Sequence, residues 1–136
     1  VFIQTFQPDH LAIQLAAKHD YEAFARDELQ SRRARGYPPF GRVARVIVRS
    51  KSRPKAAEGI KRVADLLAEP ARIAGLEILG PQPCPIAKIS RYWRFHLLLK
   101  ARSAKALMHL WDQVRRDLSA PAGTQLAIDV DPQSTL

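Results

Sequence analysis

The sequence predicts an α+β fold for most of the chain, and three observations support this. The 136 residues are 46% hydrophobic and 26% charged, which is the composition of a globular protein with a buried core. From residue 42 onward, stretches with strand-like alternation are interspersed with stretches at helical spacing. Gly and Pro mark several of the boundaries between these stretches. We expect one domain with a shorter appended region.

The appended region is expected to form a short strand and two helices. Residues 1–6 are mostly apolar and are followed by Gln-Pro-Asp, so they predict a strand, which would need a sheet to pair with. Residues 10–18 and 21–35 have apolar side chains at helical spacing. Asp20 is placed to cap the second helix, because its side chain can accept a hydrogen bond from a backbone N–H of the first turn.

A proline-rich segment is expected to separate this region from the rest. Gly36 is placed to end the second helix. Residues 36–41 read Gly-Tyr-Pro-Pro-Phe-Gly, which cannot be helical and predicts a rigid extended linker. We expect the aromatic side chains of this linker to pack against its own domain. The predicted organisation is a first region over residues 1–41 and a domain over residues 42–136.

The domain over residues 42–136 shows the order strand, helix, strand, strand, helix, strand. That order is the split βαβ, ferredoxin-like arrangement (βαββαβ). Right-handed crossovers would place the first and third strands in the centre of the sheet, with both helices on one face and the other face open. The expected strands are 42–49, 76–79, 92–100 and 125–131, and the expected helices are 54–69 and 103–118.

The open face of this sheet is expected to be basic. No acidic residue shares that face in either central strand, and such a surface suits contact with a phosphate backbone. A plain solvated face is the alternative, because the outer face of an antiparallel sheet is polar in any case. Side-chain alternation places on the open face Arg45, Arg49, Tyr92, Arg94, His96 and Lys100.

The chain has a net charge of +9 and a pI near 10.3, and the positive charge is concentrated in one block. Residues 32–62 hold eleven basic residues and one acid, whereas residues 1–31 have a net charge of −3. A block of one sign indicates a polyanionic partner, nucleic acid before an anionic membrane surface. For Arg32, Arg33 and Arg35, compensation of the helix dipole is an equally good explanation.

The motifs that carry enzymatic or metal chemistry are absent from the sequence. It has no phosphate-binding loop, dinucleotide fingerprint, nucleophile elbow or zinc-protease motif. Its single cysteine, Cys84, excludes an internal disulfide and a cysteine-based zinc site. A small phosphatase of the same fold would need an anion-binding loop after the first strand, where residues 50–54 contain no glycine. We therefore expect this chain alone to be no enzyme and to hold no cofactor.

Several short motifs, in a fixed order along the chain, resemble one protein family. The stretch GYPPF at residues 36–40 and the ending IDVDP at residues 128–132 are each short, but their combination at this separation is specific. Together with the other motifs they resemble the C-terminal part of the PriA family of replication-restart helicases, primosomal protein N′, over essentially the whole chain. The other motifs are IQTF at 3–6, HDY at 19–21, LGP at 79–81 and LLLK at 97–100.

The resemblance implies the role of a longer parent protein. The parent would be an ATP-dependent, 3′-to-5′ DNA helicase of the bacterial cytoplasm, associated with the nucleoid. It would recognise stalled forks and D-loops and help to reload the replicative helicase. ATP with Mg and zinc would bind to parts of the parent outside this chain. Residues 1–6 would end the second helicase lobe, and residues from 42 on would form a C-terminal DNA-binding domain.

The resemblance and the basic face together define the expected binding residues. DNA, as forks, D-loops or single strands, would be held by its backbone without readout of sequence. The acidic tail of single-stranded DNA-binding protein would lie at Arg102 and Lys105, beside Ala104, where relatives have a basic residue. Other primosome proteins and the parent's helicase lobes are further expected partners, and a membrane is not. The expected DNA-binding residues are Arg42, Arg45, Arg49, Lys51, Arg53, Lys88, Arg91, Tyr92, Arg94 and Lys100.

Two other functions are compatible with the same residues. A basic open sheet of this fold would serve an RNA-binding or ribosome-binding module equally well. Alternatively, the basic block could dock on the helicase lobes in a purely structural role. Competition between fork DNA and structured RNA would separate the first alternative, and failure to bind any nucleic acid at low salt would favour the second.

Overall fold

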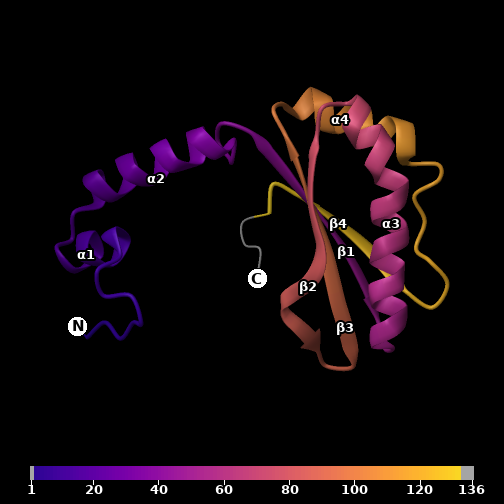
Figure 1. Ribbon diagram of the computed structural model, residues 1–136, viewed down its shortest axis with the longest axis horizontal. Coiled ribbons are helices and arrows are strands. Elements are labelled where there is room, and N and C mark those ends of the chain that lie inside the picture. Colours follow the sequence, from indigo (N-terminus) through magenta and orange to yellow (C-terminus); the bar gives the residue numbers. More distant parts are fainter. Residues whose placement is uncertain (1, 133–136) are drawn as a thin grey trace. The chain divides into compact units, whose positions relative to one another are not determined.

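The computed structural model describes residues 2–132 and divides into two compact units (Figure 1). The first unit is Val1–Arg35 and the second is Gly36–Leu136. The division falls at the start of the proline-rich segment, whereas we had expected the segment to close the first region at residue 41.

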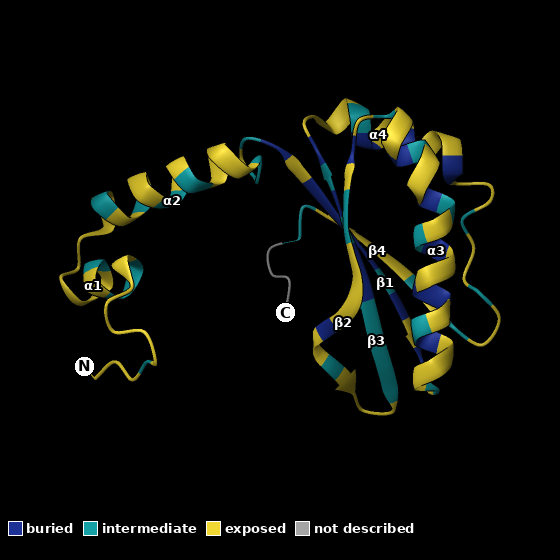
Figure 2. Ribbon diagram, viewed as in Figure 1, coloured by how far each residue is buried: buried dark blue, intermediate teal, exposed yellow. Residues whose placement is uncertain are grey.

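The first unit is a pair of helices, α1 (Leu11–Ala17) and α2 (Tyr21–Arg35). Asp20 caps α2 as predicted, because the backbone N–H of Ala23 donates to Asp20 Oδ1 at 3.0 Å. Gly36, with φ of +67°, follows the last residue of α2 in the left-handed conformation that glycine adopts most easily. Neither helix contains a buried residue, as Figure 2 shows.

The strand predicted over residues 1–6 is not formed within the described residues. Residues 2–5 have no regular structure, and the side chains of Phe2 and Phe6 are fully exposed. A strand needs backbone partners on a neighbouring strand, and the described residues offer none to this segment. An apolar pattern in the sequence indicates which side chains could be buried, but it does not show whether a neighbouring strand is present to pair with the backbone.

The proline-rich segment forms a tight turn, so the prediction of an extended linker is wrong. The N–H of Phe40 donates to the carbonyl of Tyr37 at 2.9 Å, across a cis peptide bond between Pro38 and Pro39. The ring of Tyr37 lies 5.4 Å from Lys100 Nζ, so this aromatic residue packs on its own domain, as predicted.

The second unit has the predicted order of strands and helices. Its antiparallel sheet has the strand order β2-β3-β1-β4, so the first and third strands are central (Figure 1). This confirms the ferredoxin-like split βαβ fold. The elements are β1 (Arg42–Ser50), α3 (Arg53–Ile73), β2 (Glu77–Ile89), β3 (Tyr92–Ala101), α4 (Ala104–Val114) and β4 (Gln125–Val130).

Strand β2 is much longer than the predicted 76–79. It continues through Gly80-Pro81 to Ile89, with shifts in register between Leu79 and Gln82 and again between Pro83 and Lys88. β2 is an edge strand, and an edge strand tolerates proline because one side of its backbone needs no partner.

The hydrophobic core lies between the sheet and helices α3 and α4. Gly59 permits close packing of α3, because a Cβ at this position would lie 3.0 Å from Val48 Cγ1. The buried side chains of the core come from alternate positions of the central strands and one stripe of each helix (Figure 2). They include Ala44, Val46, Val48, Leu97 and Leu99 of the sheet, and Ile60, Val63, Leu67, Leu107, Leu110 and Val114 of the helices.

Candidate nucleic-acid interface

The net charge belongs entirely to the second unit. Residues 36–136 hold seventeen Lys and Arg against eight Asp and Glu, whereas residues 1–35 hold five of each. Within the second unit, the strand register places the predicted basic residues of the central strands on the face opposite the helices. Arg45 lies opposite Leu98, Ile47 opposite His96, and Arg49 opposite Arg94.

The centre of this face does not present Arg45 to solvent. Arg45 is 2% exposed, and its Nε donates a hydrogen bond to Nδ1 of His96, which is also 2% exposed. The prediction that Arg45 is exposed on the open face is therefore wrong. Alternation along a strand identifies the face of the sheet on which a side chain lies. The neighbouring side chains decide whether that side chain is exposed to solvent.

His96 is held as a neutral imidazole. A guanidinium can only donate, so Nδ1 of His96 accepts the bond from Arg45 and the ring proton lies on Nε2. The side-chain amide of Gln82 is 3.3 Å from Nε2, and it satisfies that proton when its oxygen faces the ring. Burial, and then the positive charges of Arg45 and Arg94, lower the pKa of His96 below its ordinary value.

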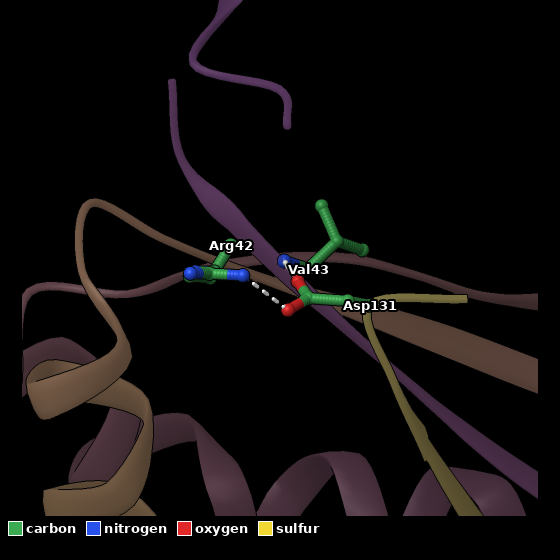
Figure 3. A network of polar contacts seen from close by, with 3 residues as sticks. All are labelled: Arg42, Val43 and Asp131. Atoms are coloured by element: carbon green, nitrogen blue, oxygen red, sulfur yellow. Dashed lines mark hydrogen bonds and ion pairs between the residues drawn. The ribbon is translucent and has the colours of Figure 1, made fainter. Parts of the chain in front are cut away.

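One end of the sheet, which we call the paired end, comprises Arg42, Glu77, Lys100 and Asp131. Arg42 Nη1 lies 2.6 Å from Asp131 Oδ2, and Lys100 Nζ lies 2.5 Å from Glu77 Oε2. Figure 3 shows the Asp131 carboxylate between the Arg42 guanidinium and the backbone of Val43, whose N–H is 3.4 Å from Asp131 Oδ1. Two of the predicted DNA-binding cations, Arg42 and Lys100, are thus already neutralised.

The opposite end of the sheet carries a cluster of cations that we call the basic end. It lies where β1 and β2 finish and where β3 and α3 begin, around the tip of the β2–β3 hairpin (Figure 1). Its seven cations have no carboxylate within ion-pair distance among residues 2–132. They are Arg49, Lys51, Arg53, Lys55, Lys88, Arg91 and Arg94.

Aromatic rings and one amide hold several of these cations in place. The guanidinium of Arg49 lies 5.3 Å from the centre of the Tyr92 ring, and its Nε donates to Gln125 Oε1 at 2.7 Å. The Trp93 ring has Arg53 at 5.5 Å and Lys88 at 5.1 Å. Such contacts are each worth about 0.5–1 kcal/mol at exposed sites, so they orient the cations without neutralising them.

A groove of about 370 Å³ opens within the basic end. The hydroxyl of Ser50 fixes its wall, because it donates to the carbonyl of Gly123 at 2.8 Å and accepts from the N–H of Ser52 at 3.2 Å. No carboxylate is among the lining residues, which are Arg49, Ser50, Lys51, Ser52, Lys55, Tyr92, Gly123, Thr124 and Gln125. Sequence reasoning missed Lys55 and Gln125 as site residues, although Lys55 belongs to the basic block over residues 32–62.

The residues predicted to bind an acidic tail lie elsewhere. Arg102 and Lys105 are exposed and flank Ser103, whose Oγ accepts from the N–H of Ala106 at the start of α4. This position follows the last residue of β3, whereas the basic end adjoins the first residue of β3. Arg102 and the basic end are therefore separated by the length of β3, about 30 Å at roughly 3.3 Å per residue.

Residues 2–132 show neither a metal-binding cluster nor a membrane-spanning helix. This part of the chain contains no group of three or more His, Cys, Asp or Glu residues that could hold a metal ion. None of its helices is both long and apolar enough to cross a membrane.

Comparison with known proteins places the whole arrangement in one family. The family model described as "Primosomal protein N C-terminal domain" matches residues 33–133, which include the entire sheet and both of its helices. The chain belongs to this family. The resemblance found in the sequence motifs is thereby confirmed.

Relatives of this primosomal protein N family match the chain over nearly its whole length. "Replication restart protein PriA" of Treponema pallidum is 35% identical, over 100% of this chain and 20% of the relative. The proteins of the same name from Haemophilus influenzae and Bacillus subtilis are each 33% identical, over 98% and 97% of this chain and 18% and 17% of the relatives. The chain thus spans about a fifth of the length of these proteins.

Proposed function

We propose that this chain is the DNA-binding C-terminal portion of a replication-restart helicase and that it holds forked or single-stranded DNA through the basic end. The observation that carries the proposal is that the cations of the basic end lack carboxylate partners, whereas many other cations of the unit are in ion pairs. Among residues 2–132, seven cations gather at one end of the sheet without a carboxylate partner, whereas Arg42, Arg62, Arg72, Lys100 and Arg115 are all in ion pairs. The other unpaired and exposed cations that the structure describes in this unit are dispersed: Lys61, Arg102, Lys105 and Arg116.

Binding of this kind is independent of sequence. Lys and Arg that neutralise phosphates release condensed counterions, and engagement of all seven cations would give a slope of log K against log salt of about −6. The cations contact no base edges in this scheme, so affinity depends on the arrangement of the strands. A protein that acts wherever a fork stalls needs that property.

The activity of the longer protein extends this proposal. The relatives are named as replication restart proteins. From the family resemblance of the sequence motifs, we propose that the parent unwinds DNA in the 3′-to-5′ direction with ATP and Mg, holds zinc, and promotes assembly of a primosome with other proteins in the bacterial cytoplasm. The acidic tail of single-stranded DNA-binding protein would bind at Arg102 and Lys105. Because that position and the basic end are separated by the length of β3, both ligands could be bound at once.

Charge reversal in the groove tests the proposal. We expect Lys51→Glu with Lys55→Glu to weaken binding of the chain to fork DNA by about 30- to 100-fold at 150 mM salt, measured by fluorescence anisotropy. The matched control is Lys61→Glu with Arg116→Glu, which changes the net charge equally at exposed positions outside the basic end, and we expect a change of less than about threefold. Equal losses in both pairs would show that only the net charge matters and would contradict the proposed interface.

The same assay separates the alternatives. If structured RNA displaced fork DNA at lower concentration than DNA itself, the chain would be an RNA-binding module. If the unsubstituted chain bound no nucleic acid at low salt, the basic end would be a docking surface for other parts of the parent protein.

A further inference from the structure

We infer that the basic end binds the duplex portion of its DNA, through phosphates of both strands, in preference to an unpaired strand. This inference rests on the proposed function and deepens it. It follows from three observations: what the open face of the sheet lacks, how the aromatic rings are used, and how the cations are spaced.

The sheet lacks the platform on which single strands are bound. Four-stranded sheets with helices on one face can bind single-stranded nucleic acid by stacking two or three bases on aromatic residues of the open face. Here the corresponding central positions are Arg45, Ile47, His96 and Leu98. Trp93 lies opposite Ser50, and Phe95 lies opposite Val48 of the core, so both rings belong to the helix-covered side.

The aromatic residue on the open face already has a partner. Tyr92 is the only aromatic side chain that the described central strands place there, and the Arg49 guanidinium lies over its ring. Trp93 likewise has a cation from each neighbouring element, Arg53 of α3 and Lys88 of β2. The rings therefore act as positioning residues for cations, and they offer no continuous surface for successive bases.

Without stacking, affinity comes from phosphate contacts alone, which favours a duplex. Stacking on protein aromatics contributes roughly 5- to 150-fold in affinity per base, and this contribution is missing here. The electrostatic contribution is larger for a duplex, which carries one charge per ~1.7 Å and releases about 0.9 counterions per neutralised phosphate, against about 0.7 for a single strand.

The cations form two groups that suit two backbones. Arg49, Lys51 and Lys55 surround the groove beside β1 and α3, whereas Lys88 and Arg91 lie at the tip of the β2–β3 hairpin. β1 and β2 flank β3, so the backbones of these two strands are about 10 Å apart at roughly 4.8 Å per strand, which is similar in size to the grooves of B-DNA, about 6 and 12 Å wide.

On the open face beside the first of these groups, two like charges face each other. Arg49 and Arg94 are direct cross-strand neighbours, an arrangement that costs free energy unless an anion lies between them. A phosphate bound at this position would relieve that repulsion.

The test compares a 20-base-pair duplex with a 20-nucleotide single strand of mixed sequence, each labelled and titrated with the full chain at several salt concentrations. We expect the duplex to bind at least about fivefold more tightly at 150 mM salt and with the steeper salt slope. Tyr92→Leu removes the ring and Tyr92→Phe keeps it. We expect Tyr92→Leu to weaken both ligands by the same small factor, since it loosens Arg49, and Tyr92→Phe to leave both unchanged.

The outcomes distinguish this inference from the proposed function. Equal or tighter binding of the single strand, or a loss in Tyr92→Leu confined to the single strand, would overturn the duplex preference and leave the DNA-binding interface standing. If neither ligand were weakened by Lys51→Glu with Lys55→Glu, the interface itself would be wrong.

Discussion

The two ends of the sheet contain the same kinds of basic side chain and differ in what surrounds them. At the paired end, Glu77 and Asp131 lie within 2.6 Å of Lys100 and Arg42. At the basic end, the groove has the neutral Gln125 beside Arg49, and no carboxylate lines it. The difference teaches that net charge alone does not locate an anion-binding surface, because the positions of the acids decide which cations remain available.

The centre of the open face differs from both ends, and its variants should have the largest effect. Arg45→Ala removes a buried hydrogen bond to His96 and should lower the free energy of unfolding by about 2–3 kcal/mol, measured by urea denaturation. Arg49→Ala, on the same face but exposed, should lower that free energy by no more than about 1 kcal/mol, because its contacts with Tyr92 and Gln125 are solvent-exposed.

DNA binding should show the opposite ranking for these two variants. Arg45→Ala, assayed where it remains folded, should bind as tightly as the unsubstituted chain, whereas Arg49→Ala should bind less tightly. If a folded Arg45→Ala chain lost DNA binding, Arg45 would have to be part of the DNA-binding interface.

Single substitutions can add a carboxylate at the basic end or remove one from the paired end. Gln125→Glu places a carboxylate where the amide now accepts from Arg49 Nε at 2.7 Å, and it should weaken DNA binding about fivefold. Asp131→Asn at the paired end releases Arg42 and should strengthen binding slightly, by less than about threefold, because Arg42 lies far from the other free cations. Anisotropy titrations with one duplex would measure the affinity of both variants. Weaker binding by Asp131→Asn would contradict the idea that ion pairing with carboxylates decides which cations bind DNA.

The smallest effect should be a dependence of stability on pH that originates at His96. The pKa of His96 is lowered in the folded chain, so the unfolded chain binds more protons just below the ordinary value of 6.5. The stabilising contribution is fully present above pH 6.5 and is lost as pH falls toward the folded pKa. Urea denaturation between pH 7.5 and 5 should show this decline, and His96→Gln should flatten it. An unchanged slope in His96→Gln would assign the decline to other groups.

Much of the fold was accessible from local patterns. The alternation Ala44, Val46, Val48 and the helical stripe Ile60, Val63, Leu67 each describe one buried face, so the order of elements followed. The strand over residues 1–6, the extended linker and the end of β2 at residue 79 were wrong, since each depends on partners distant in sequence or on a turn closed by a backbone hydrogen bond.

Part of the candidate site could likewise be predicted from local sequence patterns, and part depended on the tertiary structure. The basic block and the side-chain alternation identified most of the cations, including Arg49, Lys51, Arg53 and Lys88. They could not show that Arg45 is buried against His96, nor that Arg42 and Lys100 are neutralised from strands β4 and β2. Lys55 and Gln125 reach the groove only through the packing of α3 and the pairing of β4 with β1.

The sequence by itself determined the family, the order of strands and helices and the concentration of positive charge in one block, because these follow from residue type, periodicity and motif spacing along the chain. The tertiary structure decided which cations remain unpaired. Ion pairs form over a few ångströms between residues as far apart as Arg42 and Asp131, and only the antiparallel register of the sheet brings such residues together.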